Sequence, residues 1–297
     1  MKSALIKLHI TVFLWGFTGV LGRAIHLNEG WLVWWRMLIT SVSMWALVLL
    51  FGKFEKISLK QFLQIGGIGV ILALHWLCFY GSIKYSNVSI ALTCLSSSAF
   101  LSAIIEPFVF RKRINFKELL FGMLAIVGIL IVYYGNIHFS SGIVIGLIAA
   151  FLAATVSVLN KKIVAGYRSH TFALYQLTGG LAGLSILMPL YNHLFHAVNI
   201  CPGKTDWLLL VMLAWFCTIL TYILYTQSLK FLTAFTSNIT LTLEPVYGII
   251  LAFVVYKENK DLSEYFYIGF ICILLAVVLQ TLAFTRSSKD KTIQYYE

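Results

Sequence analysis

Long apolar runs, separated by short charged or turn-forming breaks, dominate the pattern of this chain. A helix needs about 20 mostly apolar residues to cross the hydrocarbon core of a bilayer. Runs of this kind occupy residues 8–26, 32–51, 62–83, 88–109, 118–135, 142–160, 172–191, 207–228, 234–256 and 265–284. Short segments of alternating hydrophobicity are absent, so helices are favoured over a membrane β-barrel. We therefore predict an all-α integral membrane protein with ten transmembrane helices.

The composition agrees with this pattern. Of the 297 residues, 60% are hydrophobic and only 11% are charged, and the mean hydropathy is +0.89. An ordinary soluble domain is about a quarter charged, so lipid is expected to surround this chain. The first run follows Lys2 and Lys7 as a signal peptide would, but it lacks a small-residue cleavage pattern. We interpret it as a retained first span.

Basic residues gather on one side of the predicted membrane. With a cytoplasmic N-terminus, sixteen of the 22 lysines and arginines face the cytoplasm, five face outward, and Arg36 lies within a span. This bias follows the positive-inside rule, so the net charge of +11 requires no nucleic-acid partner. We expect a multi-pass protein of the plasma membrane, in bacteria the inner membrane, with both termini cytoplasmic and membrane lipids around it.

A weak internal similarity links the two halves of the chain. Segment 82–84 aligns with 228–230 at an offset of 146, and Phe13 aligns with Phe151 at an offset of 138. Each half would contain five spans, an odd number, so the second half must be inverted. Inverted repeats place a substrate site near the membrane midplane and permit alternating access. The predicted units are a first five-helix repeat at 1–140, an inverted repeat at 141–285 and a cytoplasmic tail at 286–297.

Several segments resemble the drug/metabolite transporter superfamily, in its EamA-type branch. They are FLWGFTGVLGR from Phe13, WLVWW followed by Arg36, and YGSIKYSNVSIALTCLSSSAF from Tyr80. Pro245 and Glu258, thirteen residues apart, are similar to the family's P…lflgE signature. The resemblance covers nearly the full length of the chain.

This resemblance implies a fold and a function. It implies ten helices in two inverted halves, with both termini in the cytoplasm. A central cavity would be lined mainly by spans 1, 3, 4, 6, 8 and 9, and members mostly export amino acids or other small metabolites. The first half departs from the family pattern, with Ala99 in place of proline and Lys112 in place of glutamate.

Glu244 lies near the middle of the ninth predicted span, about 15 Å along the helix. A charge at this depth costs at least a few kcal/mol, so such a residue usually faces a cavity or a partner. Thr236, Thr240 and Tyr247 share its helical face, and Pro245 can kink the helix beside it. We predict that Glu244 anchors the substrate and couples transport to protons. The alternative is a carboxylate neutralised for folding alone.

Other polar and aromatic residues lie in the predicted spans. Arg36 either snorkels toward the outer interface or binds an anionic group. Glu106 is interpreted as structural because it lies near a cytoplasmic helix end, and Asn160 is a weaker candidate for the same reason. His75 could relay protons, although a packed histidine is the commoner case. The predicted substrate-binding residues are Trp15, Arg36, His75, Trp76, Tyr80, Tyr222, Tyr225, Thr240, Glu244 and Tyr247.

The sequence lacks several motifs that would indicate catalysis, nucleotide binding or metal binding. The chain has no phosphate-binding loop, no HExxH motif and no C-x-x-C pair among its five cysteines. We therefore expect no enzyme activity, no ATP coupling within the chain, no metal and no cofactor. The predicted function is export of a small amino-acid-like or aromatic metabolite. The alternatives are an uncoupled facilitator and a non-transporting lipid-handling or assembly module, and the residues leave the oligomeric state open.

Overall fold

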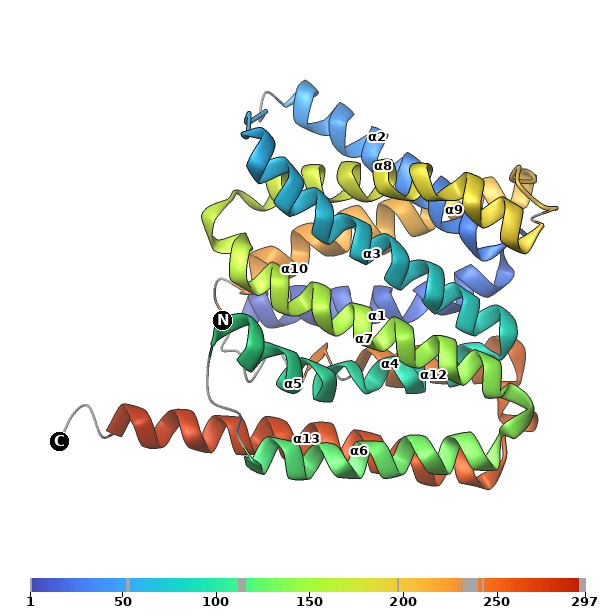
Figure 1. Ribbon diagram of the computed structural model, residues 1–297, viewed down its shortest axis with the longest axis vertical. Helices are drawn as coiled ribbons and strands as arrows, with labels where there is room; N and C mark the ends of the chain where they lie inside the picture. The colour runs from blue at the N-terminus through green and yellow to red at the C-terminus, as the bar shows by residue number, and fades with distance from the viewer. Residues whose placement is uncertain are drawn as a thin grey trace.

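The structure is a computed structural model that describes residues 2–51, 54–111, 116–196, 198–229, 231, 240–241 and 243–293. Side chains are described for these residues except 116–122, 226, 229 and 280–293. The described elements are all helical, and the helices run back and forth beside one another (Figure 1).

The described helices have the following bounds. In chain order they are α1 (Lys2–Ala24), α2 (Glu29–Leu50), α3 (Leu59–Tyr85), α4 (Val88–Ser96), α5 (Ser98–Phe110), α6 (Phe116–Gly135), α7 (Ser140–Ile163), α8 (Ser169–Phe195), α9 (Lys204–Ala214), α10 (Thr221–Leu229), α12 (Leu243–Tyr256) and α13 (Glu264–Ile293). A π-helical segment, η3 (Trp215–Leu220), connects α9 to α10. The start of α1 and the end of α13 lie at the same end of the molecule (Figure 1).

Membrane spans can be assigned by length and hydropathy. Within the described part of the chain, seven helical segments are long and apolar enough to cross a bilayer. Shorter apolar helices at Met123–Gly135, Leu243–Tyr256 and Glu264–Leu279 coincide with the remaining predicted spans. The all-α, multi-pass membrane class is therefore confirmed, whereas the count of ten spans stays a prediction.

Two predicted spans contain interruptions that the apolar pattern did not indicate. The fourth span divides at Ser97, whose Oγ donates to the carbonyl oxygen of Cys94 at 2.6 Å. In the eighth span, Thr218 Oγ1 donates to the carbonyl oxygen of Leu213 at 2.9 Å, within the π-helical segment. Hydroxyl groups that bond to preceding carbonyls compete with the regular helical ladder. Pro107 lies inside α5, ten residues after the break at Ser97.

Glycines bring α3 and α8 into backbone contact. A Cβ atom placed on Gly69 would lie 1.9 Å from the carbonyl oxygen of Gln176, and one on Gly179 would lie 2.2 Å from the Cα of Gly66. Helices in lipid associate through such small residues because the hydrophobic effect does not drive them together. The α3–α8 contact therefore depends on the missing side chains.

Replacing Gly69 by alanine is expected to lower the free energy of unfolding by about 1–3 kcal/mol, because the methyl group overlaps the α8 backbone. Reversible unfolding in mixed detergent micelles measures the change. Gly67→Ala is the matched control on the same helix, since a Cβ atom there meets nothing within 4 Å. Equal stability of the two variants would contradict the close α3–α8 contact.

Candidate functional site

The guanidinium group of Arg36, on α2, is buried among α3 and η3, with only 2% of the residue exposed. Its Nη1 donates to Tyr80 Oη at 2.6 Å, while Nε and Nη2 donate to Thr218 Oγ1 at 3.2 Å and 2.8 Å. The guanidinium carbon lies 4.0 Å from the ring centroid of Trp76, which places the charge over the aromatic face. Arg36 therefore points into the protein and not toward the outer interface.

The π-helical segment η3 orients the acceptor that holds Arg36. The hydroxyl proton of Thr218 is used in the bond to the carbonyl oxygen of Leu213, so its oxygen lone pairs can face the guanidinium group. On the other side, Tyr80 and Trp76 come from α3 at a spacing that places them on one helical face. Two segments, α3 and η3, thus hold the cation that α2 carries.

The described partners of Arg36 are all neutral. Its described contacts are the hydroxyl groups of Tyr80 and Thr218 and the aromatic rings of Trp76 and Tyr80. Among the described residues, no carboxylate forms an ion pair with it. A buried charge without a counter-charge carries a desolvation penalty of several kcal/mol. This cluster is consequently a positively charged site inside an apolar helical protein.

A second group of predicted residues lies where α1 meets α10 and α12. The rings of Trp15 and Tyr225 are 5.4 Å apart, and those of Phe13 and Tyr247 are 5.7 Å apart. A Cβ atom on Gly16 of α1 would lie 3.0 Å from Tyr247 Cβ, so the two helices are in close contact. Aromatic side chains thus flank the α1–α12 contact.

Glu244 lies in α12, one helical turn before Tyr247, and is partly buried. In the described part of the chain, its carboxylate makes no hydrogen bond and no ion pair. Thr240, one turn earlier, is buried, while Thr236 lies outside the described residues. No described contact connects Glu244 to the Arg36 cluster. The structure therefore separates the two charged groups among the predicted site residues.

Tyr222 belongs to a polar group that the sequence did not indicate. Its Oη donates to Gln176 Oε1 at 3.2 Å, and Gln176 Nε2 donates to Asn160 Oδ1 at 2.9 Å. Gln176 lies on α8 and is almost fully buried. Gln176 is uncharged and lies within an apolar run, so the sequence pattern did not identify it as a candidate. Asn160 was predicted to lie near the membrane interface. These three residues connect α7, α8 and α10.

His75 and Glu106 make contacts of a structural kind. His75 Nδ1 lies 2.8 Å from the carbonyl oxygen of Ala149, so this nitrogen carries the proton of the bond between α3 and α7. Its ring stacks on Phe79 with centroids 6.2 Å apart. Glu106 accepts a hydrogen bond from Lys161 Nζ at 3.0 Å at an exposed position. Both observations agree with the structural interpretation.

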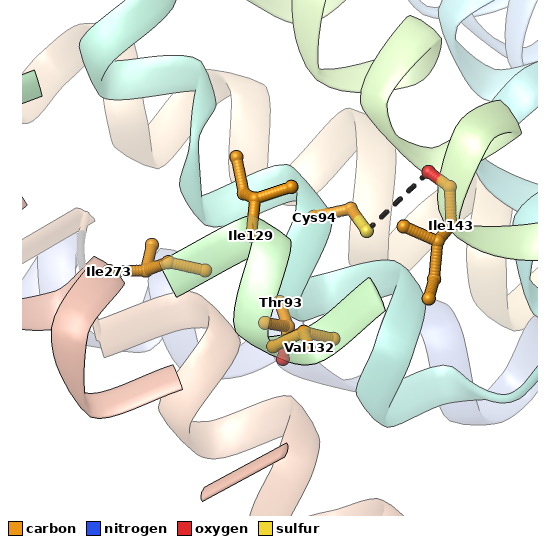
Figure 2. A pocket seen from close by; sticks show the side chains of 6 residues that line it. All are labelled: Thr93, Cys94, Ile129, Val132, Ile143 and Ile273. Atoms are coloured by element: carbon orange, nitrogen blue, oxygen red, sulfur yellow. Dashed lines mark hydrogen bonds between the residues drawn. The ribbon is translucent and has the colours of Figure 1, made fainter. Parts of the chain in front are cut away.

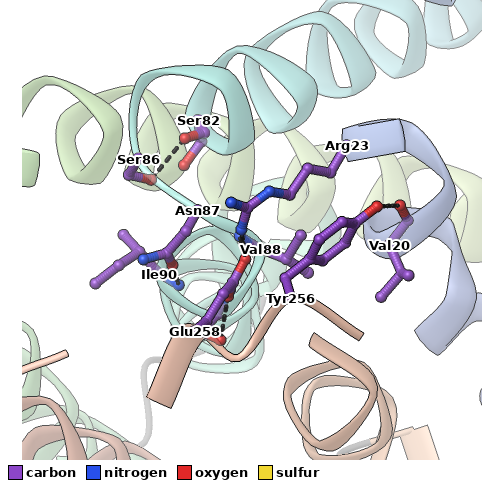
Figure 3. Close-up of polar contacts among 10 residues, drawn as sticks. Val20, Arg23, Ser82, Ser86, Asn87, Val88, Ile90, Tyr256 and Glu258 are labelled. Carbon is purple, nitrogen blue, oxygen red and sulfur yellow. Dashed lines mark hydrogen bonds and ion pairs between the residues drawn. The ribbon is translucent and has the colours of Figure 1, made fainter. Parts of the chain in front are cut away.

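A further cluster, which we call the Glu258 cluster, connects α1, α4 and α12 (Figure 3). The carboxylate of Glu258 accepts from the backbone nitrogens of Val88 and Ser89 at 2.9 Å and 2.8 Å and from the Ser89 hydroxyl group. It also forms an ion pair with Arg23. The acid therefore binds the first turn of α4, where the helix dipole favours negative charge.

Neighbouring contacts extend the Glu258 cluster to α1 and α12. The guanidinium carbon of Arg23 lies 4.4 Å from the ring centroid of Tyr256, and Tyr256 Oη donates to the carbonyl oxygen of Val20 at 2.8 Å (Figure 3). Sequence reasoning identified Glu258 only through the family signature and did not pair it with Arg23. The partners are 235 residues apart, so no local pattern connects them.

Figure 2 shows a small pocket that is separate from the residue clusters described above. It is lined by the mainly apolar side chains of Thr93, Cys94, Ile129, Val132, Ile143 and Ile273, and has no room for a water molecule. Cys94 Sγ donates to the carbonyl oxygen of Ile143 at 3.7 Å across it. This space is a packing defect between helices. The described residues also contain no group of His, Cys, Asp and Glu that could hold a metal ion.

Comparison with known proteins places this architecture in one family. The profile of the EamA-like transporter family matches residues 2–134 and 140–282. The "Uncharacterized transporter YxxF" of Bacillus subtilis is 24% identical over 279 residues, covering 89% of this chain and 85% of the relative. An "Uncharacterized transporter" of Haemophilus influenzae is 21% identical over 292 residues, covering 92% of each chain.

A solved structure shows the same fold. It is described only as the crystal structure of a protein, is 16% identical, and superimposes with a TM-score of 0.61 over 95% of this chain and 98% of its own. The double match of the family profile over most of the chain carries the assignment: the protein is a multi-pass membrane protein that belongs to the EamA-like transporter family.

Proposed function

We propose that this transporter exports a small amino-acid-like or aromatic metabolite by alternating access, with Glu244 as its central anchor. The observation that carries the proposal is the Glu244 carboxylate, which makes no hydrogen bond or ion pair with any described residue and lies beside the aromatic α1–α12 contact. An ionisable residue within a membrane span usually marks a substrate or ion pathway. A carboxyl group can release a proton and then bind a cation, so Glu244 can exchange a proton for a cationic group.

No ionisable group among the described residues near α12 forms a described pair with Glu244. This helix packs on α1 and α4, whose ionisable side chains are Lys2, Lys7, His9, Arg23 and Cys94. Lys7 Nζ donates to Gln227 Oε1 at 2.9 Å, and Arg23 is held by Glu258. The ammonium group of an amino-acid-like substrate would thus find a carboxylate beside the aromatic rings of Trp15, Tyr225 and Tyr247.

The proposed mechanism includes ten spans in two inverted repeats, and the helix contacts support this arrangement. We match α1 with α7, α2 with α8, α3 with α9 and α10, α4 and α5 with α12, and α6 with α13. Under this matching, α10 and α12 pack on α1 as α3, α4 and α5 pack on α7. The pairs α2–α8 and α6–α13 pack on each other. These matched contacts are what an inverted repeat with a pseudo-two-fold axis requires.

Reconstitution into proteoliposomes tests the function. Radiolabelled amino acids and aromatic metabolites are expected to exchange by counterflow, and an imposed pH gradient is expected to drive their accumulation above equilibrium. Liposomes without protein are the control. Counterflow that ignores the pH gradient would favour the uncoupled facilitator. Absence of counterflow for every water-soluble metabolite would contradict the exporter and favour a lipid-handling or assembly module.

A further inference from the structure

The described residues satisfy only part of the hydrogen-bonding capacity of Arg36. A guanidinium group carries five N–H donors. The described bonds to Tyr80 and Thr218 use one N–H each from Nε, Nη1 and Nη2, which leaves two N–H groups without a described acceptor. Tyr80 Oη accepts from Arg36, and no described residue accepts the hydroxyl proton of Tyr80. The cluster thus has N–H and O–H donors that no described residue accepts.

The charge of the cluster also favours an anionic ligand. Arg36 stays charged in proteins, and its described partners are two hydroxyl groups and two aromatic rings. The described residues supply no carboxylate to it. Hydroxyl and aromatic contacts offset only part of the cost of burying a cation. An anionic ligand would both accept the remaining N–H groups and neutralise the charge.

The planar shape of the guanidinium group favours a carboxylate among possible anionic ligands. Thr218 bridges Nε and Nη2, and the Trp76 ring covers one face at 4.0 Å. These contacts leave one N–H on Nη1 and one on Nη2, and a guanidinium group can bind the two oxygens of a carboxylate with two such N–H groups. We propose that Arg36, supported by Tyr80 and Thr218, binds the carboxylate of the transported metabolite. The inference rests on the proposed function and names its substrate class: a carboxylic acid, as a simple anion or as a zwitterion.

A purely structural role for Arg36 makes different predictions. The residue connects α2, α3 and η3, so its loss would lower stability under either interpretation. If Arg36 only connects the helices, the protein should not distinguish a carboxylate from its amide. If Arg36 binds the ligand, the carboxylate should bind more tightly than the amide. The test therefore compares ligands within each variant and does not depend on absolute stability.

The experiment measures ligand-induced thermal shifts of the full-length protein in detergent. The probes are matched pairs, each carboxylate beside its neutral amide, including L-phenylalanine with L-phenylalaninamide and 3-phenylpropionate with its amide, together with inorganic phosphate and chloride. At least one carboxylate should stabilise the wild-type protein, and its amide should not. Arg36→Lys should weaken that binding by about tenfold or more, because lysine retains the charge but loses the fork. Tyr80→Phe should weaken it about threefold to tenfold.

The matched control is Arg168→Gln, which removes an exposed arginine and should leave binding within about twofold. Equal stabilisation by an amide and its carboxylate, unchanged carboxylate binding in Arg36→Lys, or stabilisation by phosphate or chloride alone would each overturn the proposal. So would the absence of any stabilising carboxylate. If Arg36→Lys does not fold, the carboxylate affinity of Tyr80→Phe alone tests the proposal, and unchanged affinity in that variant would overturn it. Binding is measured without vesicles, so a carboxylate that binds through Arg36 but is never transported would refute the exporter and retain this site.

Discussion

Replacing Glu258 by alanine is expected to lower the free energy of unfolding by about 3 kcal/mol, because hydrogen bonds to a buried charged acceptor each contribute about 1.5–3 kcal/mol. Glu258 is fully buried and accepts from the backbone nitrogens of Val88 and Ser89. Alanine would leave these N–H groups of α4 and the Arg23 guanidinium group without their acceptor. The variant should therefore lose the connection between α1, α4 and the end of α12.

Reversible unfolding in mixed detergent micelles, followed by circular dichroism, measures this loss. Asp261→Asn is the matched control, since it removes an exposed acid three residues away. Arg23→Gln should cost about 1 kcal/mol or less, because the Arg23 side chain is 35% exposed and water can replace its partner. A loss in Asp261→Asn as large as that in Glu258→Ala would show that the carboxylate of Glu258 does not hold these helices together.

Glu244→Gln is expected to abolish accumulation driven by a pH gradient, with a fall of about tenfold or more in the accumulation ratio. The amide has nearly the same shape but cannot release a proton at neutral pH, so it cannot exchange a proton for substrate. Counterflow without a gradient should survive in part, because that reaction requires rearrangement of the protein but no net proton movement. The two activities should therefore separate in this variant.

Transport in proteoliposomes at several pH values measures this separation. Glu106→Gln is the matched control, because Glu106 also precedes a proline but pairs with Lys161 at an exposed position. It should respond to pH as the wild-type protein does. Transport by Glu244→Gln at the wild-type rate at every pH tested would show that protons are not coupled through this carboxylate, and uncoupled facilitation would then be favoured.

The apolar pattern predicted the fold class because a bilayer imposes a simple rule on length and polarity. It did not predict the break at Ser97 or the π-helical segment η3. At each of these two places a hydroxyl group donates to a backbone carbonyl oxygen: that of Ser97 to Cys94, and that of Thr218 to Leu213. Hydropathy averaged over a span is insensitive to one such bond.

The candidate site could be predicted only where residues lie on the same helix. Trp76 and Tyr80 share a face of α3, and both contact Arg36 as residues of a common site would. The sequence did not show that Thr218 would complete this cluster, nor that Gln176 would connect Asn160 with Tyr222. Such partners come from distant helices, and their distances are set by helix crossings. One sequence contains no direct information about those crossings.

The π-helical turn in η3 has a consequence for the helical positions that follow it, and so for the alignment of the two proposed repeats. A π turn closes its hydrogen bond over five residues and so accommodates about one residue more than an α turn. A helical wheel drawn without a break through α9 and α10 therefore misplaces every position after Leu220 by about 100°. Because α3 is continuous over Leu59–Tyr85, the proposed repeat would require a single-residue gap within Trp215–Leu220 when α3 is aligned with α9–α10.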